Sequence, residues 1–281
     1  MPRPISVFIC SACGAETLKW QGQCPACGEW NSLEQRAVRR PAGAKGGSGV
    51  AVSGASPPAA PVSLAASRDL DLERLPSGQG ELDRVLGGGL VPGSVTLLGG
   101  DPGIGKSTLL LQVAAHVAAG RGGVVYASGE ESVSQVGLRA RRLGIAATTL
   151  EALAETDLQS ILDHTAARKA ALLVVDSIQT VQSATVAASA GAVSQLRECT
   201  AELVRFAKTT ATAVILIGHV TKEGAIAGPR VLEHLVDTVL YFESEAGSRF
   251  RIVRATKNRV GAVNELGFFA MTEAGLKEVR N

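Results

Sequence analysis

The feature that most constrains the fold of this 281-residue chain is a glycine-rich turn at residues 99–108, GGDPGIGKST. It matches Gly-x-x-x-x-Gly-Lys-Ser from Gly100 to Ser107 and stands between an apolar run, Val95–Leu98, and a helical pattern, Ser107–Ala119. Between a strand and a helix, such glycines let backbone N–H groups point at phosphates, and the helix N-terminus favours an anion. The sequence therefore predicts a nucleotide site at this turn.

The expected ligand is ATP with Mg²⁺. Lys106 is placed to neutralise the β- and γ-phosphates, and the Ser107 hydroxyl to ligate magnesium. The residues expected to contact the nucleotide are Gly100, Asp101, Pro102, Gly103, Ile104, Gly105, Lys106, Ser107 and Thr108.

Three polar residues follow other apolar runs and are candidates for the same site. Asp176 ends the run at 171–175 and is suited to hold the water shell of magnesium, unless it is an ordinary strand-ending aspartate. Glu130 is the candidate general base, with Glu131 as the residue that starts the next helix, although either glutamate suits a helix N-terminus. His219 is either a sensor of the γ-phosphate or a structural histidine.

Strands and helices alternate beyond residue 67, which predicts an α/β fold with a mainly parallel sheet flanked by helices. Only 4% of residues are aromatic, so the core must consist of aliphatic side chains, as in a sheet covered on both faces. The expected strands are Val95–Leu98, Val124–Ala127, Leu172–Val175, Val214–Ile217 and Val239–Phe242, with a closing pair between Arg249 and Met271. The expected helices are Ser107–Ala119, Val133–Leu143, Leu158–Arg168 and Ser194–Lys208, and Gly120 and Gly144 mark helix ends.

Four of the five cysteines precede residue 28, as two Cys-x-x-Cys knuckles. Such spacing predicts a structural zinc site, a small ribbon or knuckle that Trp20 and Trp30 are expected to cover. Two disulfides and an iron–sulfur site are the alternatives, the former disfavoured inside a cell. The fifth cysteine, Cys199, lies in a helical pattern and is expected to be a buried, inert thiol. The predicted zinc ligands are Cys10, Cys13, Cys24 and Cys27.

Composition divides the chain into three expected parts. These are a zinc module at 1–36, a flexible linker rich in Ala, Gly, Ser and Pro at 37–66, and a large ATPase domain at 67–281. A net charge of +2 neither indicates nor excludes nucleic acid, because it averages over local basic surfaces. No signal peptide or membrane span is apparent, so a cytoplasmic protein without membrane contact is expected.

Several stretches together resemble one family. The run at 80–94, GELDRVLGGGLVPGS, leading into the P-loop, is similar to the RecA-type ATPase core. With the cysteine knuckles, YASGEES at 126–132, the stretch at 218–243 and KNRVG at 257–261, the chain resembles the bacterial RadA (Sms) family. The resemblance covers everything except the linker, and the combination is more specific than any single motif.

The resemblance implies a homo-hexameric ring around DNA, similar to DnaB-type helicases, that extends recombination intermediates by branch migration. It implies single-stranded or branched DNA and a RecA-type recombinase as partners. It also suggests that Lys257 and Arg259 reach the γ-phosphate on a neighbouring subunit; without it, they would be a basic turn in solvent. The family has Phe where this chain has Val260, and it continues into a domain similar to the Lon protease, whereas this sequence stops at Asn281.

Two segments are candidates for contact with DNA. Gln179–Ala192 has the small, polar composition of a mobile loop, and Thr221–Arg230 contains Lys222 and Arg230 as the expected phosphate-binding residues. The leading hypothesis is thus an ATP-driven DNA motor in homologous recombination and repair. The alternatives are a RecA-fold ATPase that acts as a switch on proteins, and a scaffold that recruits a recombinase without motor activity.

Overall fold

A computed structural model describes the chain in two compact units, Met1–Asp71 and Leu72–Asn281. The residues it describes are 5–10, 16–17, 19–25, 28–31, 33–38, 73–120, 122–146, 149–219, 232–244 and 247–279. The expected boundaries at 36 and 66 stay predictions, although the strand that begins at Leu33 continues to Val38, two residues into the expected linker.

The first unit contains a three-stranded antiparallel sheet in the order β2-β1-β3. Its strands are β1 (Ile5–Cys10), β2 (Glu16–Thr17) and β3 (Leu33–Val38). Cys10, Cys24 and Leu33 are buried together, with Phe8 packed against them. The expectation that Trp20 and Trp30 cover this core is wrong, because they are 58% and 68% exposed. Phe8 and Leu33, which lie on the paired strands β1 and β3, take that place.

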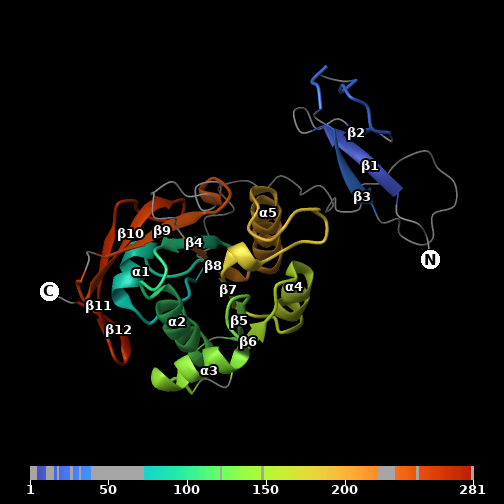
Figure 1. The fold of residues 1–281 in the computed structure, drawn as a ribbon. Coiled ribbons are helices and arrows are strands. Elements are labelled where there is room, and N and C mark those ends of the chain that lie inside the picture. The colour runs from blue at the N-terminus through green and yellow to red at the C-terminus, as the bar shows by residue number, and fades with distance from the viewer. Residues whose placement is uncertain are drawn as a thin grey trace. The chain divides into compact units, whose positions relative to one another are not determined.

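The second unit is built on a nine-stranded sheet in the order β12-β11-β10-β9-β4-β8-β7-β5-β6, shown in Figure 1. The six strands from β9 to β6 are parallel, and β10, β11 and β12 are antiparallel additions at one side. The strand bounds are β4 (Val95–Gly100), β5 (Val124–Ser128), β6 (Leu150–Ala154), β7 (Leu172–Asp176), β8 (Ala213–His219), β9 (Thr238–Glu243), β10 (Phe250–Asn258), β11 (Leu266–Thr272) and β12 (Gly275–Glu278). The predicted mainly parallel α/β fold is confirmed.

Helices cover both faces of this sheet. The helices are α1 (Gly80–Leu86), α2 (Lys106–Gly120), α3 (Val133–Arg142), α4 (Leu158–Ala167) and α5 (Val193–Thr210), with a short 3-10 turn, Ile178–Thr180. Helices α1, α2 and α3 contribute to one hydrophobic cluster, and α4 and α5 to a second cluster. Because alternate residues of each strand point to opposite faces, the parallel strands supply side chains to both clusters.

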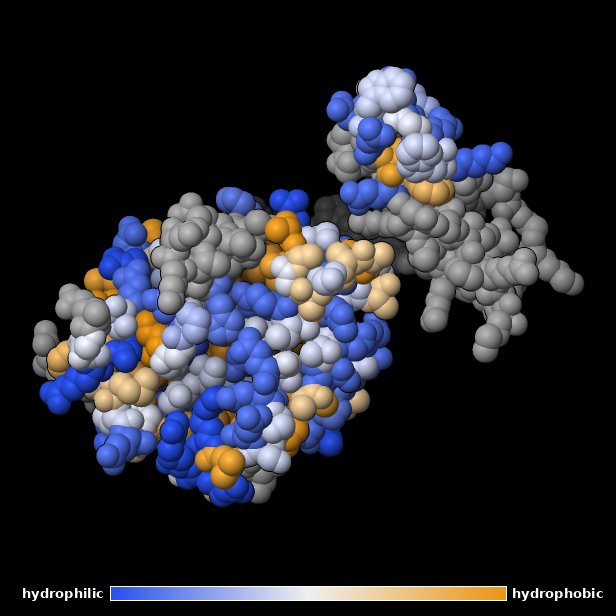
Figure 2. Space-filling view, viewed as in Figure 1, coloured by the Kyte–Doolittle hydropathy of each residue, from blue (hydrophilic) through white to orange (hydrophobic). Residues whose placement is uncertain are grey.

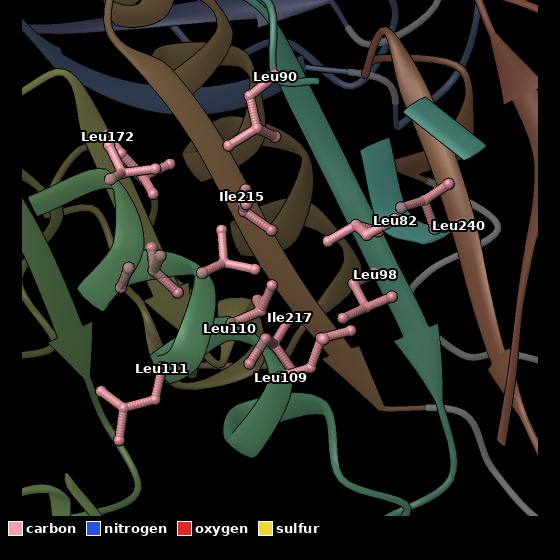
Figure 3. Close-up of a cluster of buried hydrophobic side chains, with 14 of the residues drawn as sticks. Leu82, Leu90, Leu98, Leu109, Leu110, Leu111, Leu172, Ile215, Ile217 and Leu240 are labelled. Atoms are coloured by element: carbon pink, nitrogen blue, oxygen red, sulfur yellow. The ribbon is translucent and has the colours of Figure 1, made fainter. Parts of the chain in front are cut away.

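The cluster beneath α2 is aliphatic, as the low aromatic content requires. Leu109 and Leu110 of α2 lie against Leu98 of β4 and Ile215 of β8 in Figure 3, and all four are nearly or fully buried. Hydrophilic residues dominate the face of the large unit seen in Figure 2, with apolar residues in scattered groups. In the part of the chain that is described, no helix has the length and apolar character needed to cross a membrane.

All five predicted strands and four predicted helices of this unit are present, with ends shifted by a few residues. Besides the short 3-10 turn, three described elements of this unit were not predicted: α1, β6 and β12. Strand β6 is only half buried and contains glutamate, so its hydrophobic pattern is weak. Helix α1 is only seven residues long, and its end depends on Gly87, whose left-handed conformation closes the last turn.

The glycines after α1 generate a test of the fold. Gly89 has φ +120°, and a Cβ there would lie 2.7 Å from the carbonyl oxygen of Leu75. We expect Gly89→Ala to lower the free energy of unfolding by roughly 1–3 kcal/mol in urea denaturation. Gly120→Ala is the matched control, because no atom lies within 4 Å of its Cβ position and it ends α2. That control should leave stability within about 1 kcal/mol of the parent, and equal losses in both variants would contradict this account.

Candidate nucleotide site

The P-loop joins the buried strand β4 to α2, which begins at Lys106. Gly103 and Gly105 have φ of +76° and +117°, a conformation that side chains disfavour. Asp101, Pro102 and Gly103 are exposed, and the space around the Cβ position of Gly103 is open for 4 Å. The turn is thus an accessible concave backbone at a helix N-terminus, which fits a phosphate group.

Lys106 is held at the base of this turn. The residue is only 3% exposed, and Nζ donates hydrogen bonds to the carbonyl oxygens of Gly100 (2.7 Å) and Asp101 (2.8 Å). Burial lowers the pKa of Lys106 to about 8, although Asp176, Asp101 and Glu130 favour its charged form. A triphosphate would supply the negative charge that this buried ammonium lacks.

Asp176 ends β7 and is buried, with 4% exposure. Its Oδ2 accepts a 2.5 Å hydrogen bond from the hydroxyl of Tyr126, which lies on β5. Burial and the charge of Asp176 raise the pKa of Tyr126 well above its ordinary value, so the phenol remains a donor. The Ser107 side chain acts in the opposite direction on this pKa and lowers it. A hydroxyl and a carboxylate are the hard oxygen donors that magnesium prefers, so these residues fit the ion.

Glu130 connects the ends of three strands. Its Oε1 accepts a hydrogen bond of 2.5 Å from Oγ of Ser177 and lies 3.0 Å from Nε2 of His219. Glu130 follows β5, Ser177 follows β7, and His219 ends β8. Glu130 remains 41% exposed, so its carboxylate is held in one orientation and still accessible to a water molecule. The predicted base and the predicted sensor are therefore direct neighbours.

Glu131 does not start the next helix, contrary to expectation. Ser132 is the N-cap of α3 and forms a capping box with Gln135, so the glutamate lies one residue outside the helix. Glu131 instead forms a 2.5 Å ion pair with Arg139 of α3. The two neighbouring glutamates thus have different surroundings, and only Glu130 joins the strand ends.

Lys257 and Arg259 flank Asn258 at the end of β10. Nζ of Lys257 donates to the carbonyl oxygens of Glu233 (2.6 Å) and Val236 (2.8 Å). Burial and the neighbouring Arg259 lower the pKa of Lys257. The side chain of Arg259 is 54% exposed, with Nη1 3.7 Å from Oδ1 of Asp237. Arg259 is the more accessible cation of the two.

The register of the sheet separates this turn from the P-loop of the same chain. Asn258 pairs with Thr238 at the start of β9, and Thr238 pairs with Thr96 near the start of β4. The P-loop leaves β4 at Gly100, four residues further along, or about 13 Å at the usual rise of a strand. Lys257 and Arg259 therefore lie on the side of the sheet where the parallel strands begin, whereas the P-loop lies on the side where they end.

Asn258 and Arg74 hold this turn in shape. Asn258 is buried, its Nδ2 donates to the Leu86 carbonyl (3.3 Å), and its Oδ1 accepts from the Val260 amide (3.0 Å). Nη2 of Arg74 donates to the carbonyl of Val260 (2.5 Å). These contacts use the backbone of Val260, so the turn does not need the phenylalanine that the family pattern has there.

The predicted DNA-binding residues Lys222 and Arg230 lie outside the described residues. The other expected loop, Gln179–Ala192, is organised by the amide of Gln195 rather than loosely placed. That buried amide accepts a hydrogen bond from the Ser183 amide (2.9 Å) and donates to three carbonyls, of Ser183, Val186 and Ala188. A cavity of about 520 Å³ lies beneath this loop, lined by Asp157, Gln182, Ser183, Ala184, Val186, Ala187, Ala188, Ser189 and Gln195.

Of the predicted zinc ligands, Cys10 and Cys24 are buried in one cluster, and Cys13 and Cys27 lie outside the described residues. No disulfide joins the cysteines in the described part of the chain. Two buried sulfur atoms from knuckles that are distant in sequence fit a thiophilic metal. Cys199 is fully buried in α5, and burial raises the pKa of its thiol to about 11, as expected for an inert cysteine.

Sequence reasoning missed Tyr126, Ser177 and Gln195. Tyr126 and Gln195 place polar groups inside apolar surroundings, at 0% and 1% exposure. A tyrosine within the otherwise apolar strand before Glu130 was the available signal, since a buried phenol usually has a hydrogen-bond partner. Ser177 is adjacent to Asp176, and its role becomes visible only when β5 and β7 are paired.

Comparison with known proteins agrees with this geometry. The AAA domain family model matches residues 61–225, which is more than half of the chain, and a model described as a rubredoxin metal binding domain matches residues 8–35. Two solved structures share the fold at low sequence identity. One is an ATPase domain with a TM-score of 0.63 at 16% identity, covering 77% of this chain and 95% of that one. The other, the RadB recombinase, has a TM-score of 0.55 at 22% identity, covering 73% and 100%.

The chain therefore belongs to the AAA domain family, and its larger unit is an ATPase domain with a RecA-like fold. Within that class it resembles the bacterial DNA repair protein RadA, as its motifs predict. It is 50% identical to RadA of Bacillus subtilis and 49% identical to RadA of Pseudomonas aeruginosa, in each case over 100% of this chain. The chain spans 61% of the length of each of these relatives.

The turn at Asn258 generates a second prediction. Asn258→Ala removes the bonds to Leu86 and Val260 and leaves buried backbone groups without partners, so we expect the free energy of unfolding to fall by roughly 1–3 kcal/mol. Gln159→Ala is the control, since its amide makes only an exposed bond, to Asp163 on α4, and should change stability by about 0.5 kcal/mol or less. Urea denaturation measures both, and an Asn258 variant as stable as the control contradicts this role.

Proposed function

We propose that the chain hydrolyses ATP between neighbouring copies in a homo-hexameric ring and uses the energy to move DNA during homologous recombination and repair, as a branch-migration helicase. The resemblance to RadA and the RecA-like fold support this proposal. Because the chain spans 61% of those relatives, the activity of the whole protein is inferred from its ATPase core. A cytoplasmic location follows from the same proposal.

The chemistry follows from the charges at the P-loop. The backbone of residues 100–105 and the Lys106 ammonium would hold the phosphates. Ser107 would ligate magnesium and Asp176 would hold its water shell, and the ion, when bound, neutralises phosphate charge. Glu130 orients a water molecule and accepts its proton, while Ser177 and His219 fix the direction of the carboxylate. His219, in contact with Glu130, is placed to sense the state of the γ-phosphate.

The observation that carries the proposal is the position of Arg259. A cation that stabilises the transferring phosphoryl group must reach the γ-phosphate. Since the turn at 257–261 and the P-loop of the same chain lie at opposite edges of the sheet, Arg259 acts on the nucleotide of a neighbour. Lys257 can join it only by exchanging its carbonyl partners for phosphate oxygens.

Mixed assemblies test action across the interface. Lys106→Ala and Arg259→Ala should each be nearly inactive alone, because losing such an arginine costs on the order of 10³-fold in rate. An equal mixture places an intact P-loop beside an intact Arg259 in about a quarter of the sites of a ring. We therefore expect the mixture to regain about a quarter of the parental ATPase activity, measured as phosphate release.

The control for this experiment is Arg254→Ala, which removes another arginine of β10, paired with Glu243 on the surface. It should keep the parental activity alone and in mixtures. A mixture of the two inactive variants that stays inactive, although both assemble as the parent does, contradicts catalysis across the interface.

DNA binding is expected to depend on backbone phosphates. We predict that affinity for single-stranded DNA falls linearly with salt on logarithmic axes, and that Lys222→Ala or Arg230→Ala each reduces the slope by roughly 0.7. Arg168→Ala, which removes a surface cation paired with Glu151, should leave the slope unchanged. Fluorescence anisotropy at several salt concentrations measures these slopes, and an affinity insensitive to salt contradicts the proposal.

Two assays separate the proposed motor from its alternatives. Stimulation of ATP hydrolysis by DNA distinguishes it from a switch that acts on proteins. Branch migration that is lost in Lys106→Ala distinguishes it from a scaffold that only recruits a recombinase.

We also propose that Cys10, Cys13, Cys24 and Cys27 bind zinc and stabilise the first unit, which is too small to fold on apolar burial alone. The match to a metal-binding family over residues 8–35 supports a metal there. On the resemblance, this unit is the contact for a RecA-type recombinase.

A further inference from the structure

The buried phenol of Tyr126 is hydrogen-bonded to Asp176, the residue proposed to hold the water shell of magnesium. The sequence contains only two tyrosines, and in this structure each donates its hydroxyl to a carboxylate. Tyr241 donates to Glu233 (2.6 Å) beside the turn of β10, whereas Tyr126 donates to Asp176 in the nucleotide site.

The sheet explains why this tyrosine reaches Asp176. Tyr126 of β5 pairs with Val174 of β7, and Asp176 lies two residues further along the same face. Such diagonal neighbours are about 7–8 Å apart at Cα, a span that a long aromatic side chain can cross. The ring of Tyr126 is 0% exposed within the cluster beneath α2, so its hydroxyl has little freedom to move.

The hydrogen bond has a directional consequence for the carboxylate. A carboxylate at the end of a strand can rotate about its terminal bond, and one buried oxygen without a donor would be costly. The Tyr126 hydroxyl donates a hydrogen bond to Oδ2 of Asp176. This bond fixes the rotation of the carboxylate and leaves Oδ1 to accept from another donor.

We propose that Tyr126 is a positioning residue that orients Asp176, and with it the water shell of nucleotide-bound magnesium. The inference rests on the proposed function, because it takes Asp176 as the residue that holds this shell. The proposal has a specific consequence. Loss of the Tyr126 hydroxyl should weaken the contribution of magnesium to nucleotide binding and leave the affinity for metal-free nucleotide unchanged.

The test measures the affinity of the full chain for a fluorescent, non-hydrolysable ATP analogue with excess Mg²⁺ and again in EDTA. The ratio of the two affinities is the magnesium gain. In Tyr126→Phe we expect the gain to fall about ten-fold, the usual worth of one hydrogen bond to a charged group. The affinity in EDTA should match that of the parent, which also shows that the variant is folded.

Tyr241→Phe is the matched control. It removes a phenol–carboxylate bond of similar length, and its ring packs against the other hydrophobic cluster, on the face of the sheet opposite to Tyr126. Its magnesium gain should equal that of the parent. Equal losses in Tyr241→Phe and Tyr126→Phe would overturn the inference, since the effect would then be a general loss of stability.

Asp176→Asn separates failure of the inference from failure of the proposed function. If Asp176→Asn loses the magnesium gain and Tyr126→Phe retains it, the inference is wrong and the role of Asp176 stands. If Asp176→Asn itself retains the gain, the proposed role of Asp176 is wrong, and the inference falls with it. If Tyr126→Phe loses affinity equally in Mg²⁺ and EDTA, Tyr126 has a structural role only.

Discussion

The parallel register of β5, β7, β8 and β4 is the constraint on which the nucleotide site depends. Parallel strands all end at one edge of a sheet, so the polar residues that follow them gather there without being close in sequence. Asp176, Glu130 and His219 come from three different strands, and the P-loop comes from a fourth. A shift of one residue in any strand would turn its carboxylate to the other face.

The antiparallel strand β10 has the opposite consequence. Because it runs back along β9, its last residues lie at the edge where the parallel strands begin. The same sheet thus has the P-loop at the ends of its parallel strands and the accessible Arg259 on the side where those strands begin. In the proposed ring, head-to-tail association would bring the P-loop of one copy together with Arg259 of the next.

The sequence predicted the P-loop, the strand ends and the mainly parallel sheet, because each depends on local pattern and on a general rule of topology. It did not predict the contacts that depend on register between strands. The bond from Tyr126 to Asp176 and the carbonyl partners of Lys257 are of this kind. Trp20 and Trp30 were misjudged for a related reason, since aromatic character favours burial but does not determine which side chain fills a small core.

The two carboxylates of the site are held in different ways, and the difference matches their proposed roles. Asp176 is buried and bonded through one oxygen to a phenol, so its carboxylate is held in one position. Glu130 is accessible and held by Ser177 and His219, which stand on strands separated from β5 in the sequence. Movement of the end of β8, where His219 lies, would redirect Glu130 and leave Asp176, at the end of β7, in place. In the proposed ring, a change at this strand end would therefore alter hydrolysis through Glu130, while the binding of the nucleotide with its metal ion is kept.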